Sequence, residues 1–155
     1  MPLWTPTAEP QMQFAVTHRP AADLPQTALG PLFAVAGGLC HVAIVGRVTT
    51  ALGATANSAK FVADPTSGAD TDLCTAADIA SVALGNWIFP AAPTTALQIS
   101  PNPGASVGAV TIAQSLGEIH AIGNVSLNTT ANQTGQVEYW AMWYPIESGA
   151  YVVSV

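Results

Sequence analysis

Turn-forming residues interrupt this 155-residue chain at short intervals, and this feature constrains the fold more than any other. The chain holds 13 Gly and 12 Pro residues, which separate short apolar segments such as PLFAVA, SAKFVAD and ASVGAVTIA. Short strands at regular spacing, with Gly, Pro and Asn turns between them, are typical of a sandwich or a barrel. We therefore predict an all-β fold of about nine or ten short strands.

Alternation of side chains supports this prediction within individual segments. In LCHVAIVGRVTTAL, the residues Val42, Ile44 and Val48 share one face of a strand, and in MQFAVTH so do Phe14 and Val16. The segment RPAADLPQTALGP is expected to be a Pro-rich connection. The architecture that fits this strand pattern best is an antiparallel two-sheet β-sandwich, jelly-roll-like, with an extended N-terminal arm.

The arm is expected over residues 1–11 and the sandwich domain over residues 12–155. The segment MPLWTPTAEPQ carries three of the twelve prolines and shows little periodicity. It is either a free tail or an arm that orders against a neighbouring subunit. In the second case Leu3 and Trp4 are candidate partner contacts.

The sequence does not decide the secondary structure of two segments. DLCTAADIASVALG contains Thr75 and Asp78 at the spacing of a loose capping box, followed by Gly85. We expect strand and turn here, with one short helix as the alternative. The Pro-rich stretch from Ala91 to Gly104 is expected to be a long loop.

The segment TGQVEYWAMWYPIESGA predicts the last hairpin, and its strand divides into two faces. The first face comprises Val137, Tyr139, Ala141 and Trp143. The second face comprises Glu138, Trp140, Met142 and Tyr144. A strand buried on one side only would carry polar side chains on the other side. We therefore expect the first face in the core, and Trp140, Met142 and Tyr144 to be partly covered by a loop or by another subunit.

Composition excludes several classes of partner. Only 8% of the residues are charged, Lys and Arg together number three, and the net charge is −6. Nucleic-acid binding needs a basic surface, so it is not expected. No apolar stretch reaches the roughly 18 residues of a membrane-spanning helix, and the N-terminal segment lacks the pattern of a secretory signal.

Catalytic constellations are not evident in the sequence. Cys40 and His41 are adjacent, so on a strand their side chains point to opposite faces. His18 and His120 are expected to be ordinary surface or edge residues. G-x-S-x-G and phosphate-binding glycine motifs are missing. We expect no enzyme and no cofactor, and we expect Cys40 and Cys74 to be buried thiols, with one disulfide as the alternative.

One acidic cluster could bind a cation. Asp64, Asp70 and Asp72 lie in ADPTSGADTDLC, and loop carboxylates can hold Ca²⁺. Their spacing differs from the EF-hand pattern, in which acids alternate before a Gly. A solvated turn is therefore the expected structure, and no metal site is assigned.

Three stretches together resemble a known family. They are LPQTALGPLFAVAGG, VGRVTTALGATANSAKFVADPTSGADTDLC and TGQVEYWAMWYPIESGAYV. Their order is similar to that in small structural proteins of tailed bacteriophages, across roughly Leu24 to Val152. The chain departs from the family pattern at ADPTSGAD, where Asn usually precedes the Pro, and at Ile146, where Leu is usual.

The resemblance implies a bacteriophage virion structural protein. The role it favours is a capsid decoration or cement protein, a homotrimer that binds the major capsid protein on the outer surface of the capsid and stabilises the head. The alternative is a tail, baseplate or fibre module that binds a host-surface glycan. Jelly rolls serve in both roles, so the fold does not separate them.

Overall fold

The described part of the chain is built from strands and turns. In the computed structural model, residues 15–25, 29–100 and 117–155 are described, and these ranges contain no helix. The all-β prediction is confirmed, with more strands than expected. The twelve strands are β1 (Ala15–Asp23), β2 (Leu29–Ala36), β3 (Cys40–Thr50), β4 (Ser58–Pro65), β5 (Thr71–Asp72), β6 (Ala77–Asp78), β7 (Trp87–Phe89), β8 (Gln98–Ser100), β9 (Glu118–His120), β10 (Gly123–Thr129), β11 (Gln136–Pro145) and β12 (Tyr151–Ser154).

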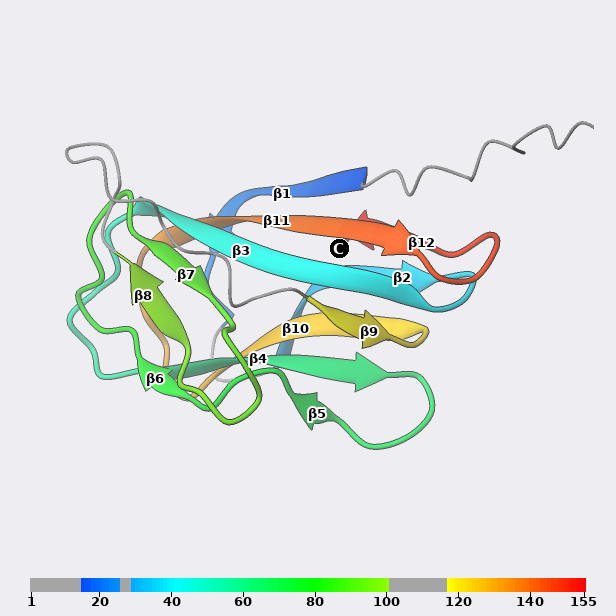
Figure 1. The fold of residues 1–155 in the computed structure, drawn as a ribbon. Helices are drawn as coiled ribbons and strands as arrows, with labels where there is room; N and C mark the ends of the chain where they lie inside the picture. Colours follow the sequence, from blue (N-terminus) through cyan, green and yellow to red (C-terminus); the bar gives the residue numbers. More distant parts are fainter. Residues whose placement is uncertain (1–14, 26–28, 101–116) are drawn as a thin grey trace, which may run out of the picture.

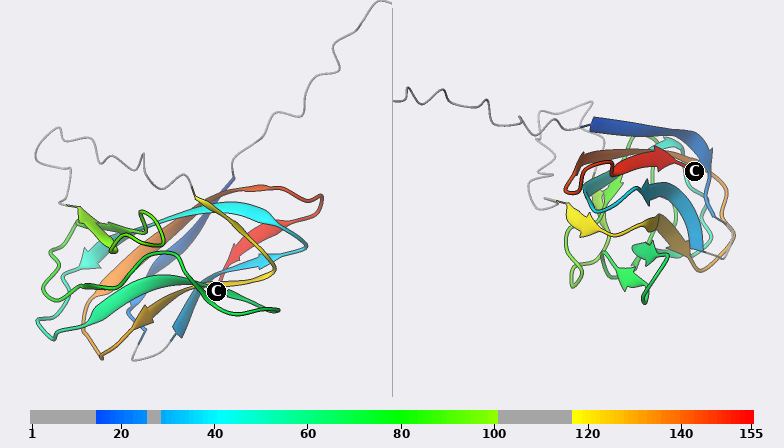
Figure 2. Two further views of the ribbon diagram at one scale, coloured as in Figure 1. Left: turned by 60° about the horizontal axis from the view of Figure 1, so that its bottom comes forward. Right: turned by 90° about the vertical axis from the view of Figure 1, so that its right-hand side faces the viewer.

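These strands form two antiparallel sheets (Figure 1). Sheet A has the order β1-β11-β3-β7-β8, and β9 also pairs with β3. Sheet B has the order β12-β2-β10-β4-β5, and β6 also pairs with β4. The sheets pack as a sandwich, as the two turned views of Figure 2 show. The jelly-roll description of the connections stays a prediction.

A single core lies between the sheets. β11 turns Val137, Tyr139 and Ala141 inward, and all three are buried, as the sequence predicted. Phe61 of β4 meets the ring of Tyr139 edge-on, with 6.3 Å between the ring centroids and 88° between the planes. Truncating a buried Phe to Ala costs about 3–5 kcal/mol, so this contact between the sheets contributes strongly to stability.

The inward face of β3 explains why this strand contains a glycine. Val42, Ile44 and Val48 are buried as predicted. A Cβ atom at Gly46 would lie 2.8 Å from the ring of Tyr139 and 2.9 Å from the side chain of Ile88. Glycine is therefore required where the Tyr139 ring lies across the strand.

Side chains close the sandwich where the edge strands β1 and β12 approach each other. The Thr17 hydroxyl donates to the carbonyl of Val152 at 2.9 Å, and it accepts a hydrogen bond from Trp143 Nε1 at 2.9 Å. Arg19 Nε donates to the carbonyl of Val155 at 3.1 Å. These bonds join the two sheets along an edge that has no strand ladder.

The prediction for the first strand was partly wrong. β1 continues through the expected connection as far as Asp23, and its pairing with β11 is irregular between Arg19 and Ala22. Proline is tolerated at such a position because an edge strand needs fewer N–H donors. Val16 points outward and is 63% exposed, whereas Phe14 lies outside the described residues.

The two ambiguous segments contain short strands. Residues 72–85 form turns around β6, so strand and turn is confirmed and the helix is not formed. The Asp78 carboxylate accepts hydrogen bonds from the N–H groups of Ala80 and Asn57, which lower the pKa of Asp78. The expected long loop after residue 90 includes β8, which the prediction missed.

The arm, residues 1–11 with Leu3 and Trp4, lies outside the described residues. The two cysteines can be compared with their prediction. Cys40 and Cys74 are both buried and both free, so the prediction of buried thiols is confirmed.

Candidate functional site

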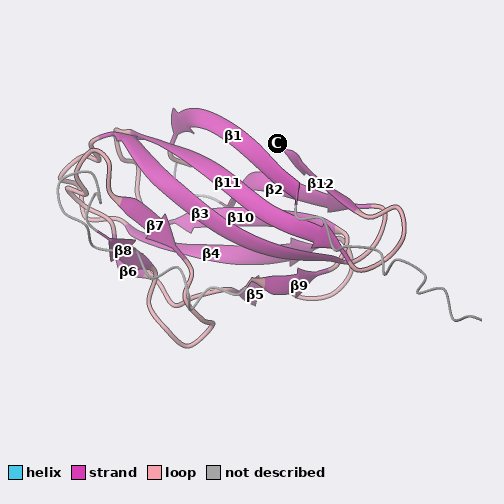
Figure 3. Cartoon of the chain, turned by 45° about the horizontal axis from the view of Figure 1, so that its top comes forward, coloured by secondary structure: helices cyan, strands magenta, loops and turns pink. Residues whose placement is uncertain are grey.

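The outer face of sheet A gathers ring-bearing side chains from several strands. Cross-strand pairing places His18 opposite Trp140, and Arg47 opposite both Glu138 and Trp87. Figure 3 shows β1, β11 and β3 side by side in this sheet. We call this surface the ring face, and it comprises Val16, His18, His41, Arg47, Trp87, Ile119, Glu138, Trp140, Met142 and Tyr144.

Trp140 lies at the centre of a row of stacked rings. The ring of His18 stacks on it with 5.2 Å between centroids and 21° between planes. Trp87 lies on the β7 side with a centroid distance of 5.7 Å and a tilt of 36°. Val45 of β3 pairs with Trp140 and is only 6% exposed, although it points outward. The row therefore covers the strand beneath it and holds Trp140 in place.

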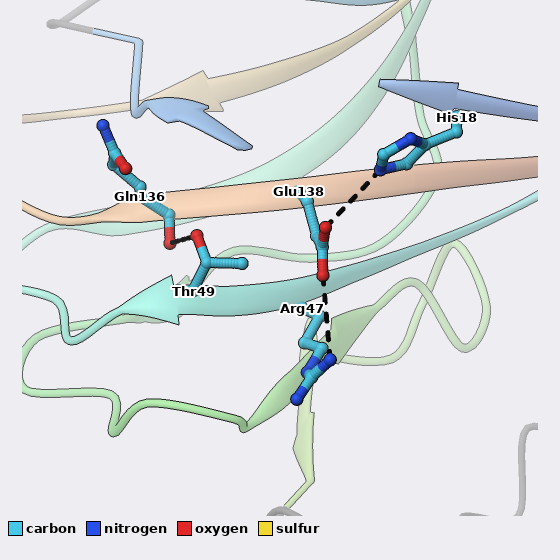
Figure 4. Close-up of polar contacts among 5 residues, drawn as sticks. All are labelled: His18, Arg47, Thr49, Gln136 and Glu138. Carbon is cyan, nitrogen blue, oxygen red and sulfur yellow. Dashed lines mark hydrogen bonds and ion pairs between the residues drawn. The ribbon is translucent and has the colours of Figure 1, made fainter. Parts of the chain in front are cut away.

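The charges of the ring face are concentrated at Glu138. Its carboxylate lies 3.5 Å from His18 Nε2 and 3.9 Å from Arg47 Nη1 (Figure 4). The Arg47 guanidinium also lies 6.0 Å from the centroid of the Trp87 ring, a cation–π distance. Because Arg47 offsets Glu138, the ring face carries almost none of the net charge of −6.

Two buried nitrogen atoms of the ring face lack a hydrogen-bond partner within the described part of the chain. They are Nδ1 of His41, whose ring stacks on Tyr144 at 4.6 Å and 13°, and Nε1 of Trp87. A buried polar group without a partner costs about 1–3 kcal/mol. Both atoms are closed off from the surface, so this cost falls on the folded chain itself.

Exposed apolar side chains flank the rings on both sides. Val16 of β1 pairs with Met142 and is 63% exposed, and Ile119 of β9 pairs with His41 and is 64% exposed. These two side chains mark the β1 and β9 ends of the ring face. Exposed apolar side chains that gather on one face are typical of interaction sites.

The predicted contact residues of β11 lie together in this surface. Trp140, Met142 and Tyr144 point outward and are half-buried. Neighbouring rings of the same sheet lie against Trp140 and Tyr144, and cover by a loop or by another subunit stays a prediction. Trp143 instead packs against the core. Leu3 and Trp4, the other two predicted contacts, are outside the described residues.

Sequence reasoning missed the ring-face residues that come from other strands. His18, Arg47 and Trp87 are far from β11 in the sequence, and only strand register brings them beside it. One signal was available, because His41 and Arg47 share the outward phase of β3. That phase alone does not show which strand lies beside β3.

The histidines are placed differently from one another. His18 and His41 lie on the outer face, and Cys40 and His41 point to opposite sides as predicted. His120 lies on β9, which within the described part of the chain pairs only with β3, so the expected edge position is confirmed, but the residue is 5% exposed and is therefore not a surface residue. Burial, with a smaller contribution from His41, lowers the pKa of His120 to about 4.

The acidic turn has a structural partner. Asp72 accepts a hydrogen bond from Lys60 Nζ at 2.7 Å, in an ion pair on sheet B. Within residues 15–25, 29–100 and 117–155, no group of three or more His, Cys, Asp or Glu side chains is placed to hold a metal ion. The same ranges include no helix long and apolar enough to span a membrane.

Comparisons with protein-family models, with curated proteins and with solved structures gave no match to this chain.

Proposed function

We propose that this chain is a structural protein of a tailed-bacteriophage virion, a capsid decoration or cement protein. In this role it binds the major capsid protein on the outer surface of the head and stabilises the lattice, as a homotrimer. The motif order in the sequence motivates the proposal, and the ring face is the observation that carries it. Trp140, Met142 and Tyr144 are the proposed centre of the contact.

The ring face suits a protein partner for three physical reasons. It is built on paired strands, so its side chains are held before the partner arrives and little entropy is lost on binding. It combines Trp, Tyr, Met and Arg, the residue types enriched at interfaces. It also carries little net charge, so it does not repel a partner of either sign. Repeated attachment across a lattice would make modest single contacts sufficient.

The geometry favours this role over binding of a host glycan. A sugar stacks on an aromatic ring whose face is open. Trp140 instead has His18 and Trp87 as ring neighbours, at 5.2 and 5.7 Å. The three tryptophans of the described ranges are all half-buried. A broad protein surface fits this arrangement better than a sugar ring does.

Mixing the purified protein with undecorated heads tests the proposal. We expect near-stoichiometric binding and greater resistance of the heads to heat. Val16→Glu places a charge on the ring face and should abolish binding. Leu84→Glu is the matched control, because Leu84 is 62% exposed and lies in a turn. Failure of the unaltered protein to bind heads at micromolar concentration would refute the proposal.

Two further measurements test the role of residues 1–11 and the trimeric state. Removing residues 1–11 should weaken attachment and leave the circular dichroism spectrum of the domain unchanged. If the shortened chain unfolds, those residues belong to the core. The mass of the protein in solution, measured by light scattering, should be three times that of the 15.8 kDa chain.

A further inference from the structure

A cavity of about 170 Å³ lies beside β3 and β9, on the side of these strands opposite to the ring face. Val42 and Ile44 of β3 and residues 90–93 supply apolar walls, and Glu118 and His120 of β9 supply the polar wall. A water molecule occupies about 30 Å³ of liquid, so the cavity has room for a small group of several heavy atoms.

Strand geometry aims both polar side chains the same way. Glu118 and His120 are two residues apart on β9, so they share one face of the strand. Ile119 between them points to the opposite side and is 64% exposed. Pairing of Glu118 with Val42 anchors this wall to β3. The carboxyl and imidazole groups therefore both line the cavity rather than the ring face.

The chain has no Lys or Arg available to neutralise Glu118. Its sequence contains only three such residues, and they are engaged elsewhere. Arg47 lies beside Glu138, Lys60 pairs with Asp72, and Arg19 donates to a backbone carbonyl. Burial raises the pKa of Glu118 because its carboxylate is partly desolvated. A positive charge that entered the cavity would offset this desolvation.

His120 adds a polar group without adding charge. Its side chain is nine-tenths buried, and the lowered pKa of about 4 keeps the imidazole neutral at pH 7. A neutral imidazole has one nitrogen that accepts hydrogen bonds. It can therefore accept a hydrogen bond from a cation without repelling it.

We propose that this cavity binds a primary ammonium group on a short alkyl chain. Glu118 is its counter-ion, His120 accepts one of its N–H groups, and Val42 and Ile44 pack against the alkyl carbons. The group could come from a free small amine or from a lysine side chain of a partner protein, since the chemistry is the same. This inference does not depend on the proposed role in a virion.

Titration of the full chain with n-butylamine at pH 7, followed by amide NMR, tests the proposal. n-Butanol is the neutral match for the probe. We expect the amine to shift the amide signals of Glu118 and His120 and to saturate. Its dissociation constant should be at least about tenfold below that of the alcohol, as expected when a charge-assisted hydrogen bond is formed.

Two substitutions distinguish the contribution of the Glu118 carboxylate from a general effect of the charge of the chain. Glu118→Gln should weaken amine binding about tenfold or more and leave alcohol binding unchanged, since it removes only the counter-ion. Asp70→Asn removes the same charge from an exposed turn and should change neither. Equal binding of amine and alcohol to the unaltered chain would overturn the proposal, even if a variant failed to fold. Unchanged amine binding in a folded Glu118→Gln variant would also overturn it.

A second probe distinguishes the two sources. Lysine blocked at both its amino and carboxyl ends represents a side chain within a protein. If it saturates and competes with n-butylamine, the cavity accepts a lysine of a partner. If only n-butylamine binds, the ligand is a free amine. Because these titrations use the free chain, their outcome is independent of whether phage heads are bound.

Discussion

The central strands of the two sheets are alike on the inside and different on the outside. β10 of sheet B and β11 of sheet A each lie between two neighbouring strands. β10 buries Val125 and Leu127, and β11 buries Val137 and Tyr139. On the outside, β10 carries Asn124, Ser126 and Asn128. The outside of β11 carries Glu138, Trp140, Met142 and Tyr144.

This difference shows which outward side chains the fold needs and which it does not need. β10 shows that a central strand of this sandwich can form with short polar side chains outside, and Ser126 among them is only 1% exposed. The large rings of β11 are therefore not needed to form the sheet. They are explained if a partner covers the outer face of sheet A and not that of sheet B.

The largest expected effect is on stability, because the two sheets share one core and should therefore unfold as one unit. Phe61→Ala in sheet B should lower the free energy of unfolding by about 3–5 kcal/mol. Three of the four tryptophans, Trp87, Trp140 and Trp143, lie in strands of sheet A, so the fluorescence of the chain reports mainly that sheet. We expect urea midpoints from fluorescence and from circular dichroism to fall together. Separate transitions would show that the sheets do not share one core.

The next largest effect is on attachment to heads, to which the outer faces of the two sheets should contribute differently. Trp140→Ala should weaken attachment to heads by about 2 kcal/mol, or roughly 30-fold, as for an interface hot spot. Asn124→Ala on the outer face of β10 should change attachment less than about twofold, because Asn124 lies on the other sheet, outside the proposed contact. Co-sedimentation with heads measures both. Equal losses from the two variants would contradict a single partner-binding face.

The inward faces could be predicted from the sequence because alternation is a local property. Val137, Tyr139 and Ala141 needed only the phase of their own strand, and the same holds for Val42 and Ile44. The ring face as a whole could not be predicted in this way. It depends on which strands are neighbours and on their register, and the sequence does not show either.

The same limit applies to one buried polar cluster that the sequence did not suggest. Asn57 is 1% exposed, and its amide donates to Gln133 Oε1 at 3.2 Å. The side-chain oxygen Oδ1 of Asn57 accepts hydrogen bonds from the backbone N–H groups of Thr130 and Ala131. These partners are more than 70 residues away in the sequence, as the bond to Gln133 (76 positions) illustrates. Local patterns of Asn, Gln and Thr indicate only turns.

A smaller effect tests whether the shared interior is dry. The hydroxyl of Tyr139 is buried without a hydrogen-bond partner in the described residues, and burial raises its pKa. Tyr139→Phe should therefore raise the free energy of unfolding by about 1 kcal/mol. It should leave head attachment unchanged, because the side chain is on the inner face. A loss of stability would show that the hydroxyl is bonded, for example to an internal water.

The smallest effects come from the ion pairs of the two outer faces. Glu138→Gln on sheet A and Asp72→Asn on sheet B should each lower the free energy of unfolding by less than about 1 kcal/mol, because one side chain of each pair is exposed to water. Only Glu138→Gln leaves an uncompensated Arg47 within the ring face. It should therefore weaken head attachment, most clearly at low salt where charges are least screened. Asp72→Asn should not. If both variants weakened attachment equally, the outer face of sheet B would also contact the partner, and the division between the two faces would be wrong.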